Sequence, residues 1–146
     1  MSAATATFRA DNLGSFLRPP ALLAARRQGL SAARLREIED RAIADVIRMQ
    51  EEVGLPVVTD GEFRRKLFFS TVVEVAEGFD PEGNARFHRD EAGHELHFGV
   101  PAPVARLRRK ASLVDAEYAY TRARTDRPIK VTMPAPSLLR PYWKEG

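Results

Sequence analysis

Apolar positions recur with helical spacing through the first third of the chain. The stripe is formed by residues three or four positions apart: Leu35, Ile38, Ala42, Val46, Met49 and Val53. This period predicts one amphipathic helix from about Ala32 to Val53, with Ser31 as its N-cap and Gly54 at its end. A shorter helix is predicted to open at Ala21–Ala25, because the preceding prolines suit a first helical turn, and to end at Gly29.

Short apolar runs of a different kind predict three strands: Phe8–Ser15, Pro56–Thr59 and Pro128–Met133. Helical segments are expected between them, at about Leu67–Glu77 and Ser112–Arg124. In the second of these, Glu117 falls in register with the apolar residues of the helix. Helices and buried strands in alternation are typical of an α/β protein.

A β-hairpin is expected at Ala85–Phe98, where apolar pairs flank the polar turn Asp90–Gly93. One βαβ unit takes about 30 residues and a complete (β/α)₈ barrel about 250. If the three strands belong to a barrel, 146 residues hold only its first units. The last residues, Pro141–Gly146, offer no closing element, so we expect an incomplete barrel.

Composition narrows the classes of protein. A hydrophobic content of 44% and a charged content of 29% are typical of a soluble globular protein. The net charge of +3 is scattered, and no apolar run approaches the roughly 20 residues that span a bilayer. The N-terminal residues lack the apolar core of a signal peptide. We therefore expect a cytoplasmic protein with neither nucleic acid nor membrane as partner.

The sequence contains no cysteine, which excludes disulfides, thiolate catalysis and any cysteine-containing zinc site within this chain. Three histidines remain: His88, His94 and His97. A metal site built on them is not expected, because positions three apart on a strand face opposite sides. The basic run Arg106–Lys110 is most simply a solvated edge strand or helix face, with RNA binding as the alternative.

Two polar turns follow predicted strands, where α/β proteins bind ligands. In Asp60–Arg65, a glycine permits a sharp turn and Glu62 can accept a ligand ammonium. The alternative is a turn with a solvated acid and two surface arginines. In Leu13–Pro19, backbone N–H groups and the Ser15 hydroxyl suit a carboxylate or phosphate. The alternative there is an ordinary glycine turn.

Three segments in this order resemble strand-end motifs of the vitamin-B12-independent methionine synthase family: Leu13–Pro19, Val57–Arg65 and Val131–Ser137. The resemblance extends over nearly the whole chain but over only about the first two-fifths of the family's barrel. It implies an α/β fold, namely a partial TIM barrel of about three β/α units with an inserted hairpin. Residues 1–146 would form the N-terminal portion of that single domain.

The resemblance also implies an activity, the transfer of a methyl group from methyltetrahydrofolate to a thiol, typically homocysteine, in methionine biosynthesis. Leu13, Gly14 and Ser15 map onto the turn that holds the amino acid's carboxylate, and Glu62 onto the acid that holds its ammonium. The family's zinc ligands, a histidine and cysteines, lie in later strands. No residue here maps onto them, so neither catalytic nor metal-binding residues are assigned. We expect the chain to be inactive alone.

Two alternatives stay open. One is a zinc-dependent alkyl transferase acting on another thiol, such as a coenzyme thiol that attacks an epoxide. The other is a non-catalytic binding or assembly module. In either case an open sheet edge favours self-association or completion by a C-terminal chain.

Overall fold

The computed structural model describes residues 10–135, 137 and 138, and for residues 81, 82, 84–88 and 96–100 it describes the backbone alone. These residues form two compact units. The first comprises residues 10–68 and 114–132, and the second comprises residues 69–113 and the described residues from 133 onward. Each unit is considered by itself.

Three helices make up most of the first unit: α1 (Pro20–Arg27), α2 (Ala32–Glu52) and α4 (Asp115–Arg122). The predicted N-cap of α2 is confirmed, because the Ser31 hydroxyl accepts a hydrogen bond from the backbone N–H of Arg34 at 3.3 Å. Helix α4 is shorter at both ends than the predicted Ser112–Arg124. The prolines therefore located α1 and the helical period located α2 and α4, with an error in the length of α4.

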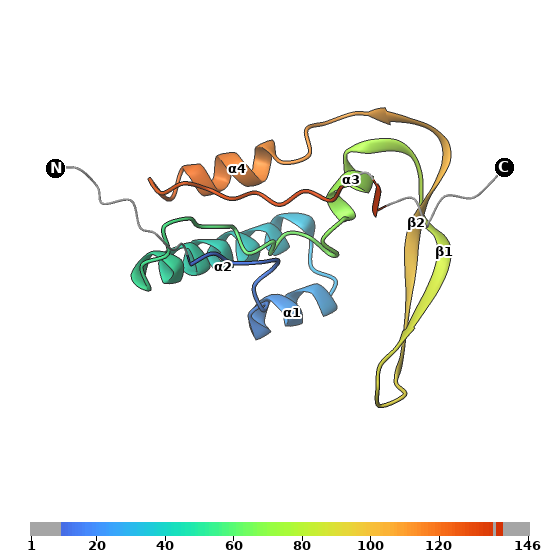
Figure 1. Cartoon of the computed structure of the whole chain (residues 1–146), viewed down its shortest axis with the longest axis horizontal. Helices are drawn as coiled ribbons and strands as arrows, with labels where there is room; N and C mark the ends of the chain where they lie inside the picture. Colours follow the sequence, from blue (N-terminus) through green and yellow to red (C-terminus); the bar gives the residue numbers. More distant parts are fainter. Residues whose placement is uncertain (1–9, 136, 139–146) are drawn as a thin grey trace. The chain divides into compact units, whose positions relative to one another are not determined.

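Both α1 and α4 pack against α2, which lies between them in Figure 1. The core is formed by apolar side chains that are almost fully buried: Leu22, Ala42, Ile43, Val46, Ile47 and Phe63. Four of these belong to α2, and two of the four, Ala42 and Val46, lie in the predicted apolar stripe. The stripe is wrong at its C-terminal end, where Met49 and Val53 are 37% and 66% exposed, and the buried face includes Ile43 and Ile47 instead. Phe63 belongs to the polar turn after Thr59, so this turn is anchored in the core of the unit.

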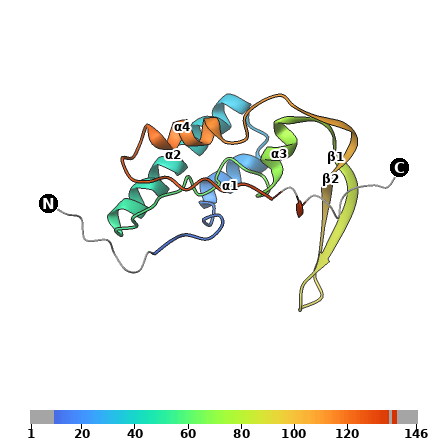
Figure 2. The same cartoon turned by 45° about the horizontal axis from the view of Figure 1, so that its top comes forward.

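The extended segments around Val58 and Ile129 pair in parallel through a single bridge, and they run side by side in Figure 2. The Val58 N–H donates to the carbonyl of Pro128 at 3.0 Å, and the Lys130 N–H donates to the carbonyl of Val58 at 2.9 Å. Prolines at 56 and 128 have no N–H with which to extend the ladder. The predicted strands at Pro56–Thr59 and Pro128–Met133 are thus paired in parallel but reduced to a bridge.

The first predicted strand was Phe8–Ser15, of which the structure describes residues 10–15. These residues do not form a strand. That segment nevertheless lies beside the parallel pair. The Lys130 ammonium donates to the Asp11 carboxylate at 2.8 Å and to the Asn12 carbonyl at 2.7 Å. These contacts are made by a side chain, so they bring the segment close without making it a strand.

The second unit contains the short helix α3 (Ser70–Glu74) and the antiparallel strands β1 (Ala76–Arg89) and β2 (Glu95–Arg109). The predicted hairpin is confirmed and is longer than expected at both ends. Of the helix expected at Leu67–Glu77, only Ser70–Glu74 is helical. Its last two residues, Ala76 and Glu77, belong to β1 instead. The basic run Arg106–Lys110 lies largely within β2, in agreement with the edge-strand interpretation.

The turn of the hairpin forms at the predicted residues. The Gly93 N–H donates to the Asp90 carbonyl at 3.0 Å, and Gly93 has a φ of +86°, which glycine adopts without a Cβ clash. Between residues 77 and 84 the pairing of the strands shifts register twice.

The described residues contain no helix long and apolar enough to cross a membrane.

Gln50 fixes the polar turn to α2. Its side chain is fully buried, and its amide donates to the carbonyls of Val46 at 2.9 Å and Thr59 at 2.8 Å. Its carbonyl oxygen accepts from the Thr59 N–H at 2.9 Å. Since Thr59 has no strand partner for these backbone groups among the described residues, Gln50 satisfies both.

We expect Gln50→Leu to lower the free energy of unfolding by about 2–4 kcal/mol, because two backbone groups of Thr59 lose their partners in a buried place. Urea unfolding measures this loss. Gln28→Leu is a matched control at an exposed position and should change stability by no more than about 0.5 kcal/mol. Equal stability of the two variants would contradict the anchoring role of Gln50.

Candidate functional site

The turn after Val58 is held in shape by its own side chains. The Thr59 hydroxyl accepts from the Gly61 N–H at 2.9 Å, and the Asp60 carboxylate accepts from the Glu62 N–H at 2.9 Å. Gly61 has a φ of +71°, and Glu62 has a φ of +59°, the one positive φ outside glycine among the described residues. A bulky residue held in this region is strained and points to a functional constraint.

Glu62 presents a buried carboxylate, with 4% of the residue exposed. One carboxylate oxygen, Oε1, accepts from the Thr132 hydroxyl at 2.7 Å. The other oxygen, Oε2, lies 3.9 Å from the Arg65 guanidinium, which is beyond hydrogen-bond distance. Glu62 is therefore fixed through one oxygen and has acceptor capacity left on the other.

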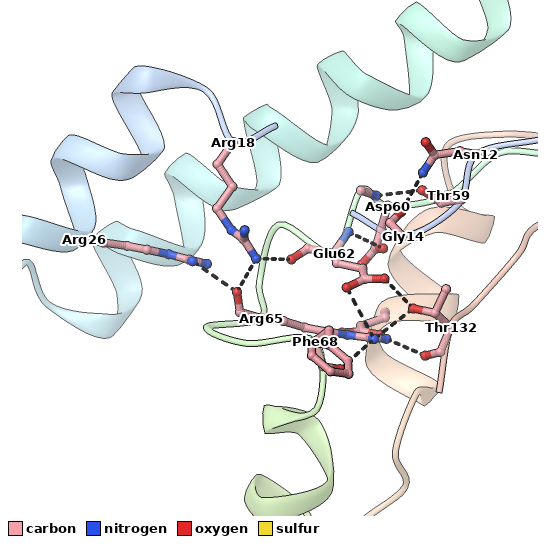
Figure 3. A network of polar contacts seen from close by, with 12 residues as sticks. Asn12, Gly14, Arg18, Arg26, Thr59, Asp60, Glu62, Arg65, Phe68 and Thr132 are labelled. Atoms are coloured by element: carbon pink, nitrogen blue, oxygen red, sulfur yellow. Dashed lines mark hydrogen bonds and ion pairs between the residues drawn. The ribbon is translucent and has the colours of Figure 1, made fainter. Parts of the chain in front are cut away.

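Arg65 is the centre of the network (Figure 3). Its guanidinium pairs with both carboxylate oxygens of Glu117, at 2.9 and 2.6 Å. The remaining N–H groups donate to the Thr132 hydroxyl and carbonyl, each at 2.9 Å, and to the Phe68 carbonyl at 3.4 Å. Burial disfavours the charge, but the hydrogen bonds and charge of Glu117 outweigh burial and raise the pKa of Arg65.

Asp60 lies beside Glu62 and is also buried, with 9% of the residue exposed. Its Oδ1 accepts from the Glu62 N–H, whereas Oδ2 is buried without a partner among the described residues. Burial raises the pKa of Asp60, and the nearby carboxylates of Glu117 and Glu62 act in the same direction. The Glu62 N–H and the Arg65 charge oppose this rise.

The second predicted turn lies next to the first. The Phe16 N–H donates to the Gly61 carbonyl at 3.3 Å, which joins the Gly14–Ser15 turn to the residue that precedes Glu62. Gly14 has a φ of +76°, and its carbonyl accepts from the Asn12 amide at 2.7 Å. Leu13 is 87% exposed, and Ser15 is exposed as well. The four residues predicted for binding thus lie on two adjoining turns.

Two arginines hold the outer side of the Glu62 turn. Arg18 donates to the carbonyls of Glu62 at 3.3 Å and Arg65 at 2.7 Å, and Arg26 donates to the same Arg65 carbonyl at 3.1 Å. Arg26 also pairs with Glu39 at 3.1 Å. Burial, together with the nearby Arg26, lowers the pKa of Arg18. These contacts fix the backbone of the turn rather than its carboxylates.

Sequence reasoning assigned no role to several residues of this network, although two of them lie in the turn that it singled out: Asp60, Arg65, Glu117 and Thr132. The alternative interpretation of two surface arginines is wrong, because Arg65 is 3% exposed and the Arg64 side chain 8%. One signal was available for Glu117, namely its position on the apolar face of its helix. An acid on a buried helical face requires a cationic partner.

The histidines lie outside this unit. Within the described part of the chain no three histidine or acidic side chains are placed to hold a metal ion. His94 lies in the exposed hairpin turn, and its Nδ1 is 2.9 Å from the Asp90 carboxylate. In the register of the hairpin, His88 is opposite Leu96 and His97 is opposite Phe87. No histidine is therefore directly opposite another.

No protein-family model matches the chain. Two uncharacterized proteins of Bacillus subtilis (strain 168) are similar in sequence. YxjH is 41% identical over 80 residues, which is 52% of this chain and 21% of that protein. YxjG is 42% identical over 88 residues, which is 56% of this chain and 23% of that protein. The matched region is about a fifth of the length of these relatives.

Two solved structures share the fold. A putative vitamin-B12-independent methionine synthase from Listeria monocytogenes has a TM-score of 0.72 at 26% identity, covering 97% of this chain and 40% of that chain. A B12-independent methionine synthase from Shewanella sp. W3-18-1, in complex with selenomethionine, has a TM-score of 0.63 at 24% identity. It covers 78% of this chain and 33% of that chain. The structural neighbours thus agree with the resemblance found in the sequence and support a related family.

The raised pKa of Asp60 makes a prediction about pH. The folded protein holds the proton of the Asp60 carboxyl group more tightly than the unfolded chain does. The stability contributed by the group is therefore fully present below its unfolded pKa, about 3.8, and is lost as the pH rises to the folded value. In Asp60→Asn this loss is absent, so the stability of the variant relative to wild type should increase from pH 4 to pH 8.

Urea unfolding of both proteins across this range measures the effect, and each unit of pKa shift corresponds to about 1.4 kcal/mol. Asp45→Asn removes an exposed carboxylate from α2 and is the control for a general change in charge. A stability difference between Asp60→Asn and wild type that is independent of pH would contradict the assignment.

Proposed function

We propose that this chain supplies the amino-acid-binding part of a methyltransferase related to vitamin-B12-independent methionine synthase. The observation that carries the proposal is the juxtaposition of two turns. The buried Glu62 carboxylate lies on one of them and the Gly14–Ser15 turn on the other, joined by the hydrogen bond from Phe16 to Gly61. An α-amino acid carries its ammonium and carboxylate on one carbon, so it requires an acceptor and a donor site in close proximity.

Each turn has the chemistry for one end of such a ligand. Oε2 of Glu62 has no hydrogen bond from the described residues and can accept from an ammonium in a charge-assisted bond. The Gly14–Ser15 turn offers backbone N–H groups and an exposed hydroxyl for a carboxylate. The side chain of the amino acid, with its thiol, would then extend beyond the groups of this chain.

The reaction implied by the resemblance breaks the bond between the methyl group and a nitrogen of methyltetrahydrofolate and forms a bond from that methyl group to the thiol sulfur. The thiol proton is lost, and the folate nitrogen regains a proton. In the family, zinc binds the substrate thiol as a thiolate, which is a nucleophile at neutral pH. The described donors do not fit such a site: the chain has no cysteine, and His94, the histidine whose side chain the structure describes, pairs with Asp90 in the hairpin turn.

We therefore assign substrate binding, and not thiol activation, to this chain. The fold supports this assignment. The parallel pairing of Val58 with Ile129 and the contacts of Lys130 to Asp11 and Asn12 are in keeping with the first β/α units of a TIM barrel. The Shewanella structure, which shares the fold, holds selenomethionine, itself an α-amino acid. Methyl transfer would require the remaining units of the barrel.

The proposal predicts that the purified chain binds L-methionine or L-homocysteine and has no methyl-transfer activity by itself. Glu62→Gln should weaken the binding of L-methionine by about 1.5–3 kcal/mol, roughly tenfold to a hundredfold in Kd, because a hydrogen bond to a charged group is lost. Isothermal titration calorimetry measures the affinity.

Two controls isolate the ammonium contact. N-acetyl-L-methionine, which has no ammonium, should bind wild type and Glu62→Gln equally weakly. Glu52→Gln, at an exposed position at the end of α2, should leave the affinity for L-methionine unchanged. Equal binding of L-methionine and its N-acetyl derivative to wild type would refute the proposal.

A further inference from the structure

The charge of Glu62 is available to a ligand only if no group of the protein neutralises it. Among the described residues the nearest cation is the Arg65 guanidinium, with Nη1 at 3.9 Å from Oε2 of Glu62. Both side chains are almost fully buried, so solvent screens the pair only weakly. An uncompensated Arg65 would become the counter-ion of Glu62, and a ligand ammonium would then have to compete with it.

Glu117 prevents this competition. Its two carboxylate oxygens accept from Nε and Nη2 of Arg65 at 2.9 and 2.6 Å, in the bidentate geometry that matches a guanidinium to a carboxylate. The other N–H groups of Arg65 donate to Thr132 and to the Phe68 carbonyl. A guanidinium has five N–H groups, and all five are occupied without Glu62.

Thr132 orients the two charges relative to each other. Its hydroxyl accepts from Nη1 of Arg65 at 2.9 Å and donates to Oε1 of Glu62 at 2.7 Å. The hydroxyl therefore lies between the cation and the carboxylate and directs the remaining oxygen of Glu62 away from a hydrogen bond with Arg65. Figure 3 shows this bridge beside the Glu62 turn.

The other charged groups near Glu62 do not replace Glu117. Arg18 donates to backbone carbonyls, including that of Glu62 itself, and not to the carboxylate. Asp60 adds a further acidic group with a buried, unpartnered oxygen. The described surroundings of Glu62 thus contain one side chain, Glu117, that hydrogen-bonds the guanidinium of Arg65 through a carboxylate.

We propose that Glu117 is a positioning residue, which neutralises Arg65 so that the carboxylate of Glu62 stays available and the site selects ligands with a free α-ammonium. This inference rests on the proposed function. It assigns a role to α4, since Glu117 lies 52 residues beyond Arg65 in the chain. Among the described residues of the two binding turns, Glu117 hydrogen-bonds Arg65 alone.

The test is the ratio between the Kd values of N-acetyl-L-methionine and L-methionine, because this ratio reports recognition of the ammonium. A general loosening of the fold would weaken both ligands alike. We expect Glu117→Gln to lower the ratio by roughly tenfold, as Arg65 turns to Glu62. Glu52→Gln is the matched control and should keep the wild-type ratio.

A double variant distinguishes charge compensation from packing. Arg65→Gln combined with Glu117→Gln removes the cation together with its partner, so Glu62 again has no competing counter-ion. We expect the double variant to recover the ratio to within about threefold of wild type. Because it leaves no buried guanidinium without its carboxylate, it also serves as the test if Glu117→Gln alone does not fold, as judged by circular dichroism.

Three results would overturn the inference: a wild-type ratio in folded Glu117→Gln, a ratio in the folded double variant as low as that of Glu117→Gln, or no selection for the ammonium by a folded double variant. Failure of the proposed function has a different signature. In that case wild type itself shows no preference for L-methionine over its N-acetyl derivative, and both proposals fall together.

Discussion

The buried guanidinium of Arg65 is the constraint on which the rest of the first unit depends. A cation with 3% of its residue exposed must be paired and fully hydrogen-bonded, since burial of an unpaired charge costs several kcal/mol. Its partners come from segments far apart in the chain: Glu117 on α4, Thr132 in the segment after the parallel bridge, and the carbonyl of Phe68. Satisfying one side chain therefore determines where these segments lie.

The same network explains how an unfavourable backbone conformation is maintained at Glu62. A φ of +59° is costly for glutamate, so the surroundings must hold it. Asp60 accepts from the Glu62 N–H on one side, Arg18 donates to its carbonyl on another, and Thr132 holds its carboxylate. Phe63, the next residue, is buried in the helical core. The strain at Glu62 is thus supported by both polar and apolar contacts.

Local patterns predicted the helices and the hairpin turn, because the apolar stripe of α2, its N-cap at Ser31 and the glycine turn at Gly93 act within a few residues. The parallel pairing was recognised, but its length was not, since it depends on which backbone groups find distant partners. Glu62 and the Gly14–Ser15 turn were found from their positions after apolar runs. Their adjacency was implied only by resemblance. Arg65 was a surface residue only in the alternative interpretation of its turn, and its burial could not be predicted, since no local signal distinguishes a buried arginine until its acid is identified.

The distribution of charge determines which part of a ligand each turn can bind. Glu117 and Arg65 compensate each other, and the carbonyls around them take up the remaining N–H groups, so this pair offers a ligand little net charge. The Glu62 carboxylate has no hydrogen-bonded cation among the described residues, while the adjoining Gly14–Ser15 turn carries polar donors and no acid. A ligand with a single charge would satisfy only one of the two turns. A zwitterion whose ammonium and carboxylate are attached to one carbon satisfies both, and this is why the geometry favours an α-amino acid over an isolated amine or carboxylate.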